Sequence, residues 1–144
     1  MRVRLLLDTT YLMPLIKIKV REVSEEAIRR ALREHEIIIS EAQIFELYAK
    51  GAKYLLDGLI SIEDLVEGVE AAYYNLERIP ITDRRVMESA ARIRRVLTDL
   101  LDSIILSTAL HHCEGIATID RRIVEAFKEE DIRSINPDLK LMQL

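Results

Sequence analysis

Short apolar segments that alternate with longer helical segments restrict the fold of this chain more than any other feature. Runs of apolar and β-branched residues predict strands at 3–7, 36–40 and 116–119. A weaker candidate at 79–81 is either a third strand or an extended link, and Pro80 argues against a central position. A final short strand is predicted at 132–135. Strands that alternate with helices are typical of βαβ units, so we predict an α/β fold with a mostly parallel sheet covered on both faces.

Capping residues give the expected starts of the helices. Thr9 or Thr10 is expected to cap a short helix, in which Pro14 fits only in the first turn. The remaining helices are predicted to be capped by, or to begin at, Ser24, Glu41, Ser61, Thr82, Asp102 and Arg121. Glycines are few, and Gly58 and Gly115 are expected to end the helices that precede them.

Length and composition fit one domain that spans residues 1–144. The single cysteine, Cys113, cannot form an internal disulfide, which suits a reducing compartment, and we expect a cytoplasmic protein. No apolar run approaches the ~20 residues of a membrane span. The apolar start at Leu5–Leu7 is too short for a signal peptide and stops at Asp8.

The net charge of −4 limits how this chain can bind nucleic acid. Proteins that bind nucleic acid through phosphate contacts alone are normally basic. A nucleic-acid role therefore requires local basic patches, or a cation that lies between the protein and the phosphate.

Four acidic residues fall where an α/β fold can gather them. Asp8 and Asp120 come directly after predicted strands, and Asp102 starts the helix that leads into the strand at 116–119. Glu46 lies in the helix after the second strand. Ligand crevices of open α/β sheets lie beyond the carboxyl ends of the strands, so these carboxylates can meet in one crevice. Like charges at one site repel each other, and a divalent cation such as Mg²⁺ or Mn²⁺ relieves that repulsion.

Each of these acids also has a purely structural explanation. The three aspartates can each cap the helix that follows. Glu46 can form an ion pair with Lys50, four residues later on the same helix. Glu41 and Asp99 lie close in sequence to two of the candidates, and spacing alone does not exclude them. The conjunction of two strand ends with two helix positions favours the functional interpretation.

Four short motifs, in this order, resemble those of the PIN-domain family. Leu7 to Thr10 resembles the opening strand-Asp-hydroxyl motif, and Ser40 to Tyr48 resembles the second motif, with its acid at Glu46. Leu101 to Ala109 is similar to the third motif, an Asp that opens an apolar helix. Gly115 to Asp120 is similar to the family's Gly…Thr-x-Asp signature. The resemblance extends over nearly the whole chain.

The resemblance implies an α/β/α sandwich and a ribonuclease that depends on Mg²⁺ or Mn²⁺. It implies that the catalytic metal ligands, directly or through water, are Asp8, Glu46, Asp102 and Asp120. The hydroxyls of Thr9 and Thr118 would orient a carboxylate or a water molecule. The chain departs from the family pattern after Asp120, where many relatives have a further Asp or Asn and this chain has Arg121 and Arg122. This departure weakens a second metal position and makes both arginines candidates for binding substrate phosphate.

Small stand-alone members of the family look most like VapC-type toxins. Such toxins act on RNA, pair with a small antitoxin that blocks the site, and commonly form homodimers. Candidates for an apolar contact between two copies are Tyr48, Tyr54 and Leu55.

Three alternatives stay open on the sequence alone. His111-His112-Cys113 suggests zinc, but a structural zinc site needs four ligands and no second cluster exists. A haloacid-dehalogenase-type phosphatase would need a second acid where this chain has Thr10. The third alternative is a PIN-like module with a silent site that only binds RNA or a partner protein, although retention of all four acids argues against it.

Overall fold

A computed structural model describes all residues 1–144 and contains one parallel sheet of five strands in the order β3-β2-β1-β4-β5. The strands are β1 (Arg4–Leu7), β2 (Glu36–Ser40), β3 (Glu77–Ile79), β4 (Gly115–Ala117) and β5 (Lys140–Met142). The central strand β1 pairs with β2 and with β4, so that Leu6 lies opposite Ile38 on one side and Ile116 on the other. These three residues are fully buried, as expected for the middle of a sheet with two covered faces.

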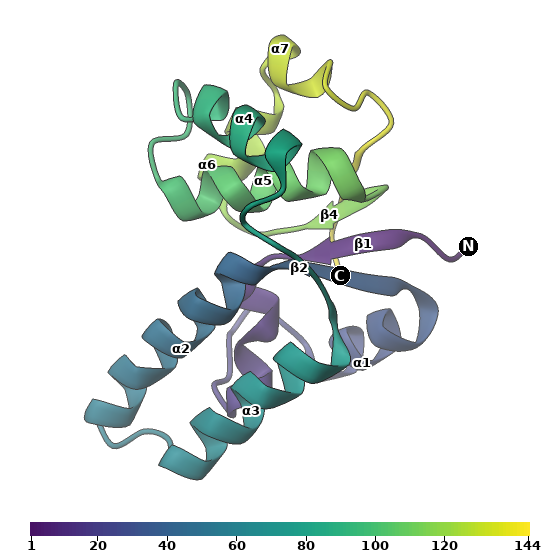
Figure 1. The fold of residues 1–144 in the computed structure, drawn as a ribbon. Coiled ribbons are helices and arrows are strands. Elements are labelled where there is room, and N and C mark those ends of the chain that lie inside the picture. Colours follow the sequence, from purple (N-terminus) through teal and green to yellow (C-terminus); the bar gives the residue numbers. More distant parts are fainter.

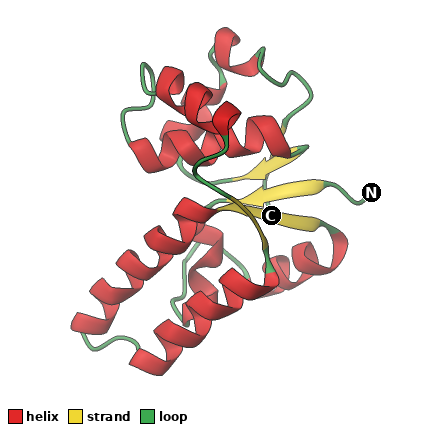
Figure 2. Ribbon diagram, viewed as in Figure 1, coloured by secondary structure: helices red, strands yellow, loops and turns green.

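Helices cover both faces of the sheet (Figure 1). One face carries η1 (Thr9–Ile16), α1 (Glu25–Glu34), α2 (Glu41–Leu56) and α3 (Ile62–Asn75). The other carries α4 (Arg84–Ile93), α5 (Leu100–His112), α6 (Arg121–Phe127) and α7 (Glu130–Arg133). Strand side chains alternate between the faces, so Leu5 and Leu7 belong to one apolar core and Leu6 to the other. Figure 2 shows the resulting three layers, which confirm the predicted α/β/α sandwich.

Several predicted boundaries were wrong for identifiable reasons. The η1 segment is a 3₁₀ helix with Pro14 inside it, and Asp8 caps it in place of Thr9 or Thr10. Asp83, not Thr82, caps α4, and its carboxylate accepts from the Val86 N–H at 3.1 Å. The third strand ends at Ile79, directly before the proline that has no N–H to offer a ladder.

The C-terminal segment also differs from the prediction. Residues 132–135 do not form a strand, because Ile132 belongs to α7 and is buried in the second core. Isoleucines at 132 and 135 are spaced as on one helical turn. The last strand is Lys140–Met142, which pairs with β4 at the edge of the sheet. None of the helices is both long and apolar enough to cross a lipid bilayer.

The order of the strands marks the place where a site is expected. From β1 the chain moves outward to β2 and β3, and then returns past β1 to form β4. The direction of winding therefore reverses between β1 and β4, whose carboxyl ends lie side by side. In open α/β sheets, this reversal opens a crevice at the carboxyl ends of the two strands. Asp8 follows β1 directly, and Asp120 follows β4 by three residues.

Candidate active site

Asp8 lies at the carboxyl end of β1 and is 5% exposed. Its backbone N–H donates to the Ala117 carbonyl at 2.9 Å, which extends the contact between β1 and β4 by one residue. Its Oδ1 accepts from the Thr9 N–H at 2.8 Å, and its Oδ2 accepts from the Thr118 hydroxyl at 2.6 Å. Both carboxylate oxygens are therefore held in fixed directions.

Thr118 and Asp120 belong to the loop that leaves β4. The Thr118 hydroxyl donates to Asp8 and accepts from the Asp120 N–H at 3.0 Å. Asp120 caps α6, because its Oδ1 accepts from the Arg122 N–H at 2.8 Å. Its Oδ2 lies 3.4 Å from Nη2 of Arg122. The Thr9 hydroxyl, in contrast, lies 3.4 Å from the amide nitrogen of Gln43.

Asp102 lies in the first turn of α5 and is 6% exposed. Asp99 caps this helix, since its Oδ1 accepts from the Asp102 N–H at 3.1 Å, and the prediction that Asp102 begins the helix was wrong. The Asp102 carboxylate is thereby left free of a capping role. Its Oδ2 is buried without a hydrogen-bond partner, and the nearest cation is Nη2 of Arg122 at 3.5 Å.

Burial raises the pKa of Asp102 to about 7, and the charges of Asp99, Asp120 and Asp8 contribute, while Arg122 opposes them. Burial also raises the pKa of Asp8, against the hydrogen bonds from Thr118 and Thr9, and the charges of Glu46 and Asp120 raise it further. The pKa of Asp8 therefore responds to the charges of Glu46 and Asp120, and that of Asp102 to the charges of Asp120 and Asp8. A buried carboxylate that lacks a hydrogen bond and faces other acids is costly unless a further cation binds there.

Glu46 is the candidate that no shared hydrogen-bond or ion-pair partner links to the other three. It lies in the second turn of α2, is half-buried, and does not form the ion pair with Lys50 that the sequence allowed. No three His, Cys, Asp or Glu side chains of the chain are close enough together to form a ready-made metal site. Thr118 thus links Asp8 to Asp120, and Arg122 links Asp120 to Asp102. Glu46 is connected to this group only through the effect of its charge on the pKa of Asp8.

Gln43 is a buried residue of the site that the sequence analysis missed. Its Oε1 accepts from the Ser40 N–H at 2.8 Å, and its Nε2 donates to the Leu7 carbonyl at 2.7 Å. Gln43 precedes Glu46 by three residues on α2, so these bonds tie the helix of Glu46 to the strand of Asp8. The Ser-x-x-Gln spacing indicates a capping box, and the structure contains one. The second partner of Gln43, the Leu7 carbonyl on β1, is 36 residues away, so no local sequence pattern predicts this contact.

The zinc alternative finds no support in the structure. His111 shares a hydrogen bond of 2.7 Å with Ser89, and His112 shares one of 2.9 Å with Asp83. Cys113 is buried. The three residues therefore have separate surroundings and do not form a common ligand set.

The comparisons with known proteins agree with the fold and the order of the motifs. The family model of the PIN domain matches residues 5–128, and the chain therefore belongs to the PIN-domain family. Members of this family are generally nucleases, so the chain is a candidate hydrolase of nucleic acid. Membership of this family argues against the haloacid-dehalogenase-type phosphatase. No curated protein matches the chain at a significant level.

Among solved structures, the chain is similar to the crystal structure of VapBC2 from Rickettsia felis bound to a DNA fragment from its promoter. The TM-score is 0.65 at 16% sequence identity, and the alignment covers 99% of this chain and 98% of that chain. At this identity the likeness supports the fold, and it does not extend to individual residues.

Proposed function

We propose that this protein is a metal-dependent endoribonuclease and the toxin of a toxin–antitoxin pair. The observation that carries the proposal is the carboxylate of Asp102, which is buried among other acids with one oxygen that has no hydrogen-bond partner. A buried acceptor of this kind is rare unless a ligand completes it. An all-carboxylate donor set suits Mg²⁺ or Mn²⁺.

The residues that would hold the cation are Asp8, Glu46, Asp102 and Asp120. A bound divalent cation supplies activation of water and neutralisation of the phosphodiester charge, so that no side-chain nucleophile is needed. The role of Thr118 and of the Thr9 backbone is to keep the Asp8 oxygens pointing in fixed directions. Gln43 holds α2, and with it Glu46, against the end of β1.

Arg122 supports binding of an anionic substrate at this acidic site. Its guanidinium is exposed and lies 3.4 Å from Asp120 and 3.5 Å from Asp102. It balances part of the negative charge and remains accessible to a phosphate oxygen. Arg121, also exposed at the start of α6, is a second candidate for the substrate backbone.

The partners follow from the size and fold of the protein and from its surface. The VapBC2 structure contains a toxin–antitoxin pair, and its aligned chain matches this one over nearly the full length, which supports a small antitoxin as partner. Exposed apolar side chains on or near α2 support a homodimer; they include Phe45, Tyr48, Leu56 and Leu59. Such pairs act on cellular RNA, so we place the protein in the cytoplasm.

The test is incubation of the pure protein with labelled single-stranded RNA in Mn²⁺ or in excess chelator. We expect cleavage in Mn²⁺, none in chelator, and none with Asp8→Asn, which should retain the fold as judged by circular dichroism. Cleavage that survives complete chelation would overturn the metal mechanism. RNA binding without cleavage under all metals tested would favour the silent binding module.

A further inference from the structure

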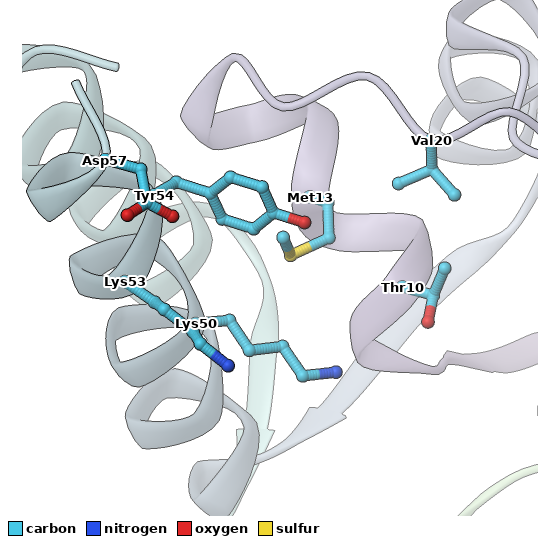
Figure 3. A pocket seen from close by; sticks show the side chains of 7 residues that line it. All are labelled: Thr10, Met13, Val20, Lys50, Lys53, Tyr54 and Asp57. Atoms are coloured by element: carbon cyan, nitrogen blue, oxygen red, sulfur yellow. The ribbon is translucent and has the colours of Figure 1, made fainter. Parts of the chain in front are cut away.

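A pocket opens between α2, η1 and the segment that follows η1. Its volume is about 470 Å³. It is lined by Thr10, Met13, Val20, Lys50, Lys53, Tyr54 and Asp57 (Figure 3). Thr10 follows Asp8 by two residues, and Lys50 follows Glu46 by about one helical turn. Two residues of the pocket lining are therefore close in sequence to two of the candidate acids.

The two lysines of this pocket have no acidic partner. Lys50 and Lys53 are exposed on α2, and neither takes part in any ion pair of the protein. Asp57 follows Lys53 by four residues, which is the less favourable order for an ion pair on a helix. In Figure 3 the Lys50 side chain reaches across the pocket toward η1. Unpaired cations beside a concave surface attract phosphate.

The rest of the lining is mixed, with Met13, Val20 and Tyr54 as its apolar and aromatic part and Thr10 and Asp57 as its polar part. Tyr54 is half-buried, and its ring reaches toward Met13 and η1 (Figure 3). A tyrosine ring provides a stacking surface for any nucleobase, and methionine adapts to flat groups placed against it. Two exposed cations and an aromatic ring thus line one cavity, and one of the cations, Lys50, follows Glu46 by about one helical turn.

We propose that this pocket holds one nucleotide of the RNA, adjacent to the phosphodiester that is cleaved. The base packs against Tyr54 and Met13, and the phosphate lies on Lys50 and Lys53. This inference rests on the proposed ribonuclease function and adds a substrate subsite to it. The cavity volume falls within the range of roughly 300–1,000 Å³ that is usual for small ligands. Unpaired cations next to an aromatic side chain are the combination by which proteins bind single-stranded nucleic acid, which favours RNA over a peptide.

The charge contribution is tested by binding in the Asp8→Asn background, which prevents cleavage. A labelled single-stranded RNA is titrated with Lys50→Ala/Lys53→Ala and followed by fluorescence anisotropy in Mn²⁺ at several salt concentrations. The control is Arg29→Ala/Arg33→Ala, which removes the same charge from exposed positions on α1 that do not line the pocket. We expect the lysine variant to bind at least about ten-fold more weakly, with a salt slope about 1.4 smaller. The arginine control should bind within about two-fold of the Asp8→Asn protein.

The stacking contribution is tested at Tyr54 in the same background. Tyr54→Leu should weaken RNA binding about ten-fold, whereas Tyr54→Phe should retain the affinity because the ring is kept. Thermal unfolding of both variants separates a loss of contact from a loss of fold.

The outcomes distinguish this inference from the proposed function. A wild-type protein that neither cleaves nor binds RNA overturns the function itself. Cleavage and binding by the wild type, with equal affinity of the lysine variant and its arginine control, overturns the pocket alone. Unchanged RNA affinity together with binding of a peptide at this pocket would assign it to a protein partner, and would equally overturn the nucleotide subsite.

Discussion

The hydroxyl of Thr118 lies 2.6 Å from Oδ2 of Asp8, which is 110 residues earlier in the chain. The same hydroxyl accepts from the backbone N–H of Asp120 at 3.0 Å. A single side chain therefore fixes the direction of one acid and the backbone position of another. It does so at the point where β1 and β4 end side by side.

We expect Thr118→Val to lower the rate of RNA cleavage about 10–100-fold, because valine keeps the shape of threonine and removes both hydrogen bonds. Thr118→Ser retains the hydroxyl and should restore most of the rate. Cleavage is measured at saturating Mn²⁺, with thermal unfolding as the check on the fold. A valine variant as fast as the wild type would show that the orientation of Asp8 is set by other contacts.

Asp102→Asn should separate metal binding from folding. Removal of the buried charge should stabilise the metal-free protein at pH 8 by on the order of 1 kcal/mol, since the charged carboxylate is buried among other acids and Arg122 offsets only part of that cost. In the wild type, Mn²⁺ at 100 times its Kd should add about 2.7 kcal/mol, and the variant should lose most of that gain. Thermal unfolding with and without Mn²⁺ measures both effects. The exposed loop residue Asp138, changed to Asn, is the control. A variant that Mn²⁺ stabilises as strongly as the wild type would remove Asp102 from the ligand set.

The cap of α4 should make stability depend on pH in the acid range. The hydrogen bond from the Val86 N–H holds the pKa of Asp83 below its ordinary value. His112 and Arg85 lower this pKa further, whereas burial raises it. Because the folded pKa lies below the unfolded value of about 3.9, the stabilisation is present above that pH and is lost as the pH falls through the folded pKa. Asp83→Ala should therefore lower the free energy of unfolding by about 1 kcal/mol at pH 7. The difference in this free energy between the variant and the wild type should become smaller below about pH 4. Urea unfolding of both proteins at pH 7 and below pH 4 measures this difference. A difference that does not change with pH would exclude the carboxylate charge as its cause.

Gly68 allows α3 to approach η1 closely, and we expect Gly68→Ala to destabilise the protein. A Cβ at this position would collide with the carbonyl oxygen of Leu15 and with the side chain of Ile16. Alanine ordinarily favours a helix by about 1 kcal/mol over glycine, but the collision should reverse the sign and cost about 1–3 kcal/mol. Gly51→Ala is the comparison, since its Cβ would meet side-chain atoms of Leu65 and Ile16 rather than backbone. Denaturant unfolding that shows Gly68→Ala to be as stable as the wild type would contradict the close approach.

The predicted elements were most accurate where the local pattern and the tertiary environment favour the same structure. The strand Glu36–Ser40 has the predicted bounds, because an uninterrupted apolar run suits a strand that is buried on both faces. The strand predicted at 132–135 was wrong, because Ile132 packs into the second core from the helix α7, whereas Ile135 lies beyond that helix and is exposed. The helix starts were also displaced by one to three residues: Asp83 caps α4 in place of the predicted Thr82, and Asp99 caps α5 in place of the predicted Asp102.

The amino-acid sequence by itself determined the class of fold, because alternating apolar runs and helices can bury their apolar faces in few other ways. It also placed Asp8 at the end of a strand and predicted a shared crevice, whereas Asp120, expected directly after a strand at 116–119, follows β4 by three residues. Only the tertiary structure decided that Asp99 caps α5 and leaves Asp102 buried with one oxygen that has no hydrogen-bond partner, and that Gln43 links α2 to β1. These contacts join residues of different elements, and their energies depend on burial and on the charges of distant neighbours, which no local pattern encodes.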